Sequence, residues 1–183
     1  MSQFVFRSHA AESVDGLLTA LDAAREQGSL EPLADFMDIG ELDPQRHILT
    51  GRKFLLFGPA QRDLIATDIL LDLGLHRTAH AAASVGNAPE AIATRLQAAG
   101  RDEGVGNWLA LLQPGHGVPP WLQHEGAPGI LRGDDLDAFR ASLAALLDSP
   151  AAAEDPGLAA ELTELQRLAD DPNTVVVSVH RSG

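Results

Sequence analysis

The chain has 183 residues, no cysteine, an apolar fraction of 45% and a formal net charge of −13. A chain of this length can bury a proper core, and the lack of cysteine excludes disulfides, thiolate metal sites and cysteine nucleophiles. The negative charge disfavours nucleic acid and anionic lipid as partners, and it favours solubility or a basic partner.

The negative charge is concentrated in the two ends of the chain. Residues 1–50 carry nine acidic and three basic side chains, and residues 102–183 carry thirteen acidic and four basic. Residues 51–101 carry four acidic and six basic side chains, so the middle is slightly positive. We find neither a signal-peptide pattern at residues 1–7 nor an apolar run long enough to span a bilayer. We therefore expect a cytoplasmic protein of bacterial type, without a membrane partner.

The first fifty residues predict a strand followed by two helices. Residues 3–8 alternate in the manner of a strand, with Phe4 and Phe6 on one face. A helix is expected from about residue 10 to residue 26, and a shorter one over residues 30–37. Residues 40–51 read as a loop.

The middle of the chain contains the strand and helix that we predict to form the centre of the core. Residues 54–57 are four apolar residues in a row, typical of a buried strand, and a helix is expected over residues 60–73. Gly74 ends this apolar pattern. Residues 75–85 fit either a helix or a second core strand, and the strand is favoured. Asn87 predicts the cap of a further helix that ends near Gly100.

Residues 113–133 alternate prolines with glycines and predict a long loop without a helix or a central strand. Loops of this length inside a compact domain are often functional. A helix is expected over residues 134–148, a linker over 149–155, a last helix from about 158 to 168, and a strand over 174–180.

These elements predict an α+β fold over residues 1–183, as a single domain. It would contain a small mixed β-sheet of N-terminal, central and C-terminal strands, packed with five to six helices mainly on one face.

Two groups of histidines are candidates for chemistry. His76 and His80 are four residues apart, so one helix or strand would place both on the same face, where they could bind a metal. His116, His124 and Glu125 lie in the 113–133 loop, where a His–Glu pair could act as general acid and base. Isolated histidine pairs occur by chance in a chain with seven histidines, so we expect neither a metal nor a cofactor.

Trp121 and the acidic start of the helix at 134 are candidates for binding. Trp121 either plugs the core beneath the loop or anchors a partner, because aromatic side chains supply much of the energy at interface centres. Asp134, Asp135 and Asp137 suit the positive end of a helix dipole and offer negative charge to a partner.

Three functions fit this sequence. The first is an acidic protein-binding domain, in the manner of an inhibitor or immunity-type partner of a basic protein; with no catalytic motif in view, it is favoured over an enzyme. The second is a small enzyme or ligand-binding domain with a His/Glu site near residues 113–133. The third is a homodimer formed through a leucine face of the last two helices or through the edge of the terminal strand.

Overall fold

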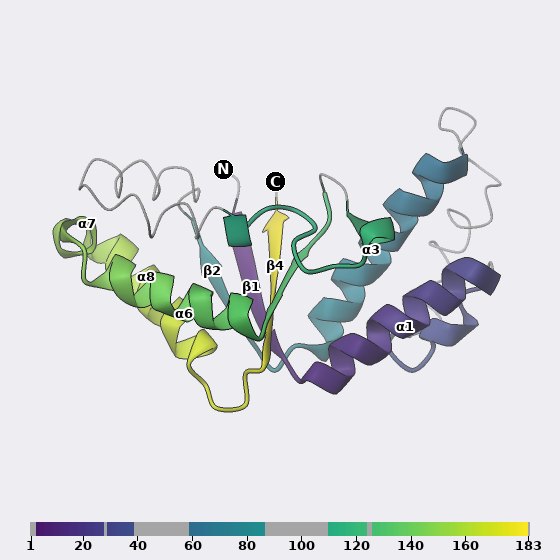
Figure 1. Ribbon diagram of the computed structural model, residues 1–183, viewed down its shortest axis with the longest axis horizontal. Coiled ribbons are helices and arrows are strands. Elements are labelled where there is room, and N and C mark those ends of the chain that lie inside the picture. The colour runs from purple at the N-terminus through teal and green to yellow at the C-terminus, as the bar shows by residue number, and fades with distance from the viewer. Residues whose placement is uncertain (1–2, 28, 39–58, 87–109, 124–125, 183) are drawn as a thin grey trace. The chain divides into compact units, whose positions relative to one another are not determined.

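The computed structural model describes residues 3–27, 29–38, 59–86, 110–123 and 126–182. Figure 1 shows them as coloured ribbon. The predicted core strand at 54–57, the loop at 40–51 and the helix from Asn87 to Gly100 lie outside these residues. The chain divides into two compact units, residues 1–10 with 80–183, and residues 11–79. The single domain therefore stays a prediction.

The first unit is built on a four-stranded sheet. Its strands are β1 (Gln3–His9), β2 (Ala81–Val85), β3 (Gly129–Arg132) and β4 (Val176–Ser182), in the order β2-β1-β4-β3. The predicted α+β class and the two terminal strands are confirmed. All strand pairs in the described part of the chain are antiparallel, rather than the mixed pairs that we expected.

The register of the strands assigns side chains to the two faces of the sheet. Phe6 is paired with Ala83 on β2 and with Val179 on β4, so these three side chains share one face. His9 and Ser178 belong to the opposite face by the same alternation. The first face is apolar and forms the core of the unit.

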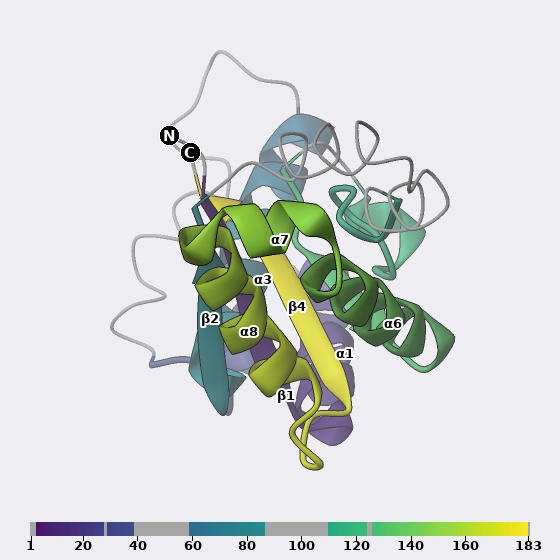
Figure 2. The same cartoon turned by 90° about the vertical axis from the view of Figure 1, so that its left-hand side faces the viewer.

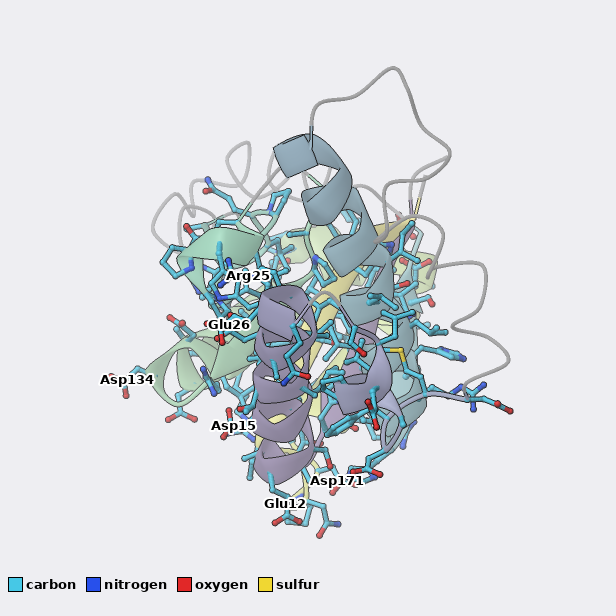
Figure 3. The ribbon with its side chains drawn as sticks, turned by 90° about the vertical axis from the view of Figure 1, so that its right-hand side faces the viewer. Glu12, Asp15, Arg25, Glu26, Asp134 and Asp171 are labelled. Carbon is cyan, nitrogen blue, oxygen red and sulfur yellow. The ribbon has the colours of Figure 1, made fainter. Side chains whose placement is uncertain are left out.

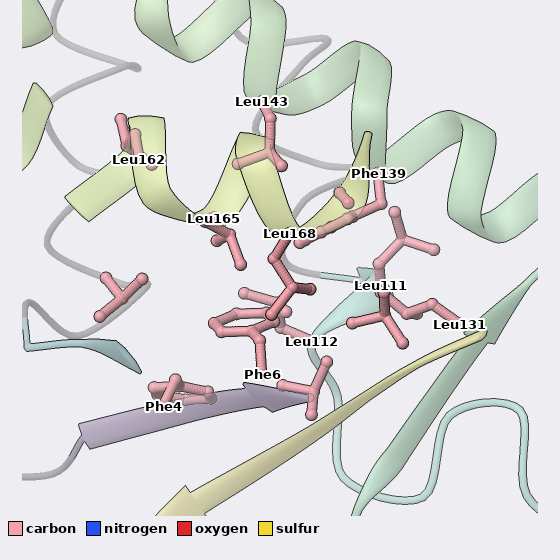
Figure 4. Close-up of a cluster of buried hydrophobic side chains, with 14 of the residues drawn as sticks. Phe4, Phe6, Leu111, Leu112, Leu131, Phe139, Leu143, Leu162, Leu165 and Leu168 are labelled. Carbon is pink, nitrogen blue, oxygen red and sulfur yellow. The ribbon is translucent and has the colours of Figure 1, made fainter. Parts of the chain in front are cut away.

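Two helices, α6 (Asp134–Leu147) and α8 (Pro156–Ala169), cover the apolar face of the sheet. The short helix α7 (Pro150–Glu154) lies between them in the chain and packs on both. Figure 4 shows leucines of α6 and α8 pointing at Phe4 and Phe6 of β1. The Phe6 and Phe139 rings stack with their centroids 5.6 Å apart. The two longer helices were predicted, whereas α7 replaces most of the linker expected at 149–155.

The residues that fill this core are apolar side chains from all four strands, from α6 and α8, and from residues 111–112. They are Phe4, Phe6, Val85, Leu111, Leu112, Leu131, Leu136, Phe139, Leu143, Leu146, Leu158, Leu162, Leu165, Leu168, Ala169, Val177 and Val179. Full burial of each larger side chain contributes about 2 kcal/mol, so this layer is the main source of stability in the unit.

The second unit contains α1 (Ala11–Gln27), the 3₁₀ turn η1 (Glu31–Leu33) and α3 (Pro59–Thr78). α1 agrees with the predicted helix. The helix expected over residues 30–37 is wrong, because only η1 forms there. Leu33 and Met37 are nevertheless buried as the apolar pattern required.

Residues 75–85 divide between a helix and a strand. α3 continues past Gly74 to Thr78, and only Ala81–Val85 is strand. A Cβ atom on Gly74 would lie 2.5 Å from Leu17 Cδ1 of α1. Gly74 is thus a glycine of close helix packing instead of a helix stop, which is why the predicted end was wrong.

Residues 113–133 are more ordered than the sequence indicated. They include the 3₁₀ turn η2 (Pro120–Leu122) and the short strand β3. The expectation that no central strand forms there is correct, because β3 lies at the edge of the sheet.

Candidate functional site

The segment Gln113–Val118 covers the outer edge of β3. Ile130 donates its backbone N–H to the carbonyl of His116 at 2.7 Å, and Gly115 donates to the carbonyl of Ala127 at 3.0 Å. Gly117 has a φ of +69°, and a Cβ atom there would overlap the carbonyl oxygen of Ile130. The approach of the segment to β3 therefore requires glycine at this position. We call β3 together with Gln113–Val118 the closed edge.

His116 is held rigidly within the closed edge. Its backbone N–H donates to Gln113 O at 3.1 Å, and its carbonyl accepts from Ile130. Its Nε2 lies 2.9 Å from Oδ2 of Asp135 in the first turn of α6. The side chain of His116 is 28% exposed and that of Asp135 is 46% exposed, so solvent screens this ion pair in part.

The His116–Asp135 pair differs from the predicted one. The sequence offered Glu125 as the carboxylate of a possible His–Glu pair, whereas among the described residues the carboxylate that contacts His116 is that of Asp135 in α6. His124 and Glu125 lie outside the residues that the structure describes. A carboxylate only accepts hydrogen bonds, so this contact fixes the orientation of the ring and places a proton on Nε2, which leaves Nδ1 as the basic nitrogen of the neutral imidazole.

Trp121 lies in η2 and is partly buried. Its side chain is neither fully covered by the loop nor fully exposed. Its use as a partner anchor stays a prediction.

The predicted acidic residues begin a larger acidic surface. Residues 134–171, which span α6, α7 and α8, carry ten acidic and two basic side chains. We call this segment the acidic layer. Its leucines point into the core, so its charges point outward. Figure 3 shows Asp134 pointing away from α6. The exposed carboxylates of the layer are Asp134, Asp137, Asp148, Glu154, Glu164, Asp170 and Asp171.

Both arginines of the acidic layer are held by groups within the same unit. Arg140 donates to Asp137 Oδ1 at 3.0 Å, to the carbonyl of Ala169 at 2.9 Å and to the carbonyl of Thr174 at 3.1 Å. Arg167 donates to Glu164 Oε2 at 3.1 Å. Arg140 thus joins α6 to the end of α8, while most carboxylates of the layer keep their charge directed at solvent.

His76 and His80 do not share one element. His76 lies in the last turn of α3, which ends at Thr78, and His80 precedes β2. No single helix or strand therefore places both side chains on one face, as the metal hypothesis required. Among the described residues, no group of three or more His, Asp or Glu side chains could hold a metal ion.

Sequence reasoning missed a contact between β1 and β4. His9 Nε2 lies 2.8 Å from Ser178 Oγ, across 169 residues of chain. An imidazole at this distance from a hydroxyl can activate a nucleophile. His9 is 0% and Ser178 1% exposed, however, so no substrate reaches them. The pair satisfies two buried polar groups in the sheet. Only the strand register, which the sequence does not give, could have revealed it.

Comparisons with protein-family models, with curated proteins and with solved structures returned no match. Within the described part of the chain, no helix combines the length and the apolar character needed to cross a membrane.

Proposed function

We propose that this protein is a binding protein whose acidic layer docks on the basic surface of another protein, in the manner of an inhibitor or immunity-type partner. The observation that carries this proposal is the charge of the acidic layer. It has ten carboxylates against two guanidinium groups, and both guanidinium groups are already engaged.

The arrangement of the acidic layer supports a surface role for its charge. The layer is anchored by leucines beneath it, so its backbone is fixed before a partner arrives. Fixed like charges raise the local potential and steer an oppositely charged protein into contact. The cost of ordering the binding surface is correspondingly small.

The test is affinity capture from the source cell with two triple variants of equal charge change. Asp134→Asn, Asp148→Asn and Glu154→Gln neutralise three exposed carboxylates in the acidic layer. Glu12→Gln, Glu26→Gln and Asp35→Asn neutralise three exposed carboxylates in the second unit. Figure 3 shows Glu12 and Glu26 on α1.

The proposal expects a basic protein that the wild type and the second-unit variant capture and the acidic-layer variant loses. Its affinity should fall several-fold as salt rises to physiological strength, where charges beyond about 8 Å are screened. Equal capture by all three proteins, or binding that is indifferent to salt, would refute the role of the layer.

The His116–Asp135 contact favours a second candidate, a small enzyme in which Asp135 orients His116 as a general base. The test is a screen of the protein against ester, amide and phosphoester substrates. An activity that is lost in His116→Asn and Asp135→Asn but kept in Asp134→Asn would support it. An activity that survives all three substitutions would exclude this pair.

Neither of the two surfaces that the sequence suggested for a homodimer is exposed for that use. The large leucines of α6 and α8 face the core, and β4 lies between β1 and β3 instead of at an edge. Self-association by another surface stays a prediction, and light scattering at two concentrations tests it.

A further inference from the structure

The sheet of the first unit has one edge that nothing in the described structure covers. β2 is the last strand in the order β2-β1-β4-β3, and among the described residues only the β1 side pairs with it as a strand. Figure 2 shows β2 as the outermost strand, with α8 beside it. Ala81, Ala82 and Ser84 are exposed. We call β2 the open edge.

The open edge lacks the features that keep edge strands from pairing. Its sequence is Ala-Ala-Ala-Ser-Val, with no charge, no proline and no large side chain to obstruct a neighbour. Every second residue of such a strand directs its N–H and C=O groups away from the sheet. These groups are a template for one more strand, the mode of recognition called β-augmentation.

The charge beside the open edge selects the occupant. Gly86, directly after β2, donates its N–H to Glu161 Oε2 of α8 at 3.2 Å. Glu164 is three residues further along α8 and lies on the same side of that helix. A strand added to β2 would thus lie next to α8 on the side that carries these two carboxylates.

We propose that the open edge binds an extended, lysine- or arginine-bearing segment of a partner protein as an added β-strand. Its basic side chains would meet Glu161 and the acidic layer. This inference rests on the proposed function, because it names where and how the basic partner docks. A second copy of this chain fits less well. Two copies joined at β2 by a two-fold axis would bring their α8 carboxylates together.

The test uses three short synthetic peptides. The first alternates lysine with valine, the second has glutamate for each lysine, and the third keeps the lysines but carries an N-methyl group on every backbone nitrogen, so that neither edge of the peptide can donate a hydrogen bond. Binding is measured by fluorescence polarisation, and hydrogen exchange of the β2 amides is followed with each peptide. The N-methyl peptide keeps its charge but cannot form the backbone ladder.

The proposal expects the lysine peptide to bind and to slow exchange in residues 81–86. The glutamate and N-methyl peptides should each bind at least about tenfold more weakly. Glu161→Gln with Glu164→Gln should weaken the lysine peptide several-fold. Glu12→Gln with Glu26→Gln, which removes the same charge from the second unit, should not.

Each other outcome counts against the open edge in a different way. Equal binding of the lysine and N-methyl peptides would leave the acidic layer as a binding surface but remove strand addition. If the lysine peptide does not bind while the acidic-layer variant still loses its captured partner, strand addition at the open edge is refuted and the proposed function stands. A concentration-dependent dimer that protects β2 would assign the edge to a second copy.

Discussion

The two edges of the sheet are treated in opposite ways. At the closed edge, Gln113–Val118 folds back on β3 and accepts the N–H of Ile130. At the open edge, β2 presents exposed alanines, and no described residue pairs with its outer side. A protein that covers one edge with its own chain can do without a partner there. The open edge is therefore the one to which we assign the proposed partner strand.

The largest contrast between the edges is expected from two glycine-to-alanine substitutions. Gly117→Ala places a Cβ atom on the carbonyl of Ile130 at a positive φ, so it should lower the free energy of unfolding by about 3 kcal/mol. Gly86→Ala, directly after the open edge, meets among the described residues only the carboxylate of Glu161, at 3.3 Å, and should cost under about 0.5 kcal/mol. Urea denaturation measures both. Equal effects of the two substitutions would show that the closed edge does not depend on the close approach of Gly117 to the carbonyl of Ile130.

A middle-sized effect is expected at the start of α8, the helix that lies over β2. Asp155 accepts hydrogen bonds from the N–H groups of Gly157 and Leu158, both at 3.1 Å. Asp155→Ala removes this cap and should lower stability by about 1 kcal/mol, whereas Asp155→Asn keeps an acceptor and should cost less. Thermal unfolding of the two variants side by side decides this, and identical melting temperatures would argue against a capping role.

A smaller effect is expected where the closed edge is tied to α6. Asp135→Asn weakens the contact with His116 and should cost about 0.5 kcal/mol, because both side chains are partly exposed. Asp134→Asn removes the same charge from the same helical turn without touching His116, and it serves as the control. Hydrogen exchange at Ile130 should quicken in Asp135→Asn alone. Unchanged exchange at Ile130 would mean that the backbone hydrogen bonds hold the closed edge together without the contact between His116 and Asp135.

The smallest effect is expected at the open edge itself. Ala81 is exposed and lies on the same face of β2 as Ala83, the face that α8 covers, so Ala81→Lys should change the free energy of unfolding by less than about 0.5 kcal/mol. The same lysine should reduce binding of the alternating lysine–valine peptide, since like charges then face each other. Ala81→Glu is the matched variant and should retain binding. A large loss of stability in Ala81→Lys would reveal that the edge is covered after all.

The sequence predicted best the elements whose signal is local. The helices α1, α6 and α8 follow apolar residues at helical spacing, and their bounds fall within two residues of the prediction. β4 was predicted from its run of valines. The short elements were missed, because β3 is four residues long and α7 five, too few for a periodic pattern.

The candidate site was predicted only in part, because its contacts join distant residues. The loop at 113–133 and the acidic start of α6 were both identified, but their contact through His116 and Asp135 spans 19 residues and has no sequence signature. The open edge could not be predicted either. Which strand lies last in a sheet depends on pairing, and composition does not reveal it.

The pairing of β1 with β4 has a consequence for biosynthesis. Gln3 is opposite Ser182 and His9 is opposite Val176, so the two inner strands of the sheet are separated by nearly the entire sequence. The ribosome must release the residues around 182 before this ladder can close, and chain closure over such a separation slows folding. Until then, the apolar side of β1 has no partner strand from β4, and the nascent chain must be kept from aggregating during that interval.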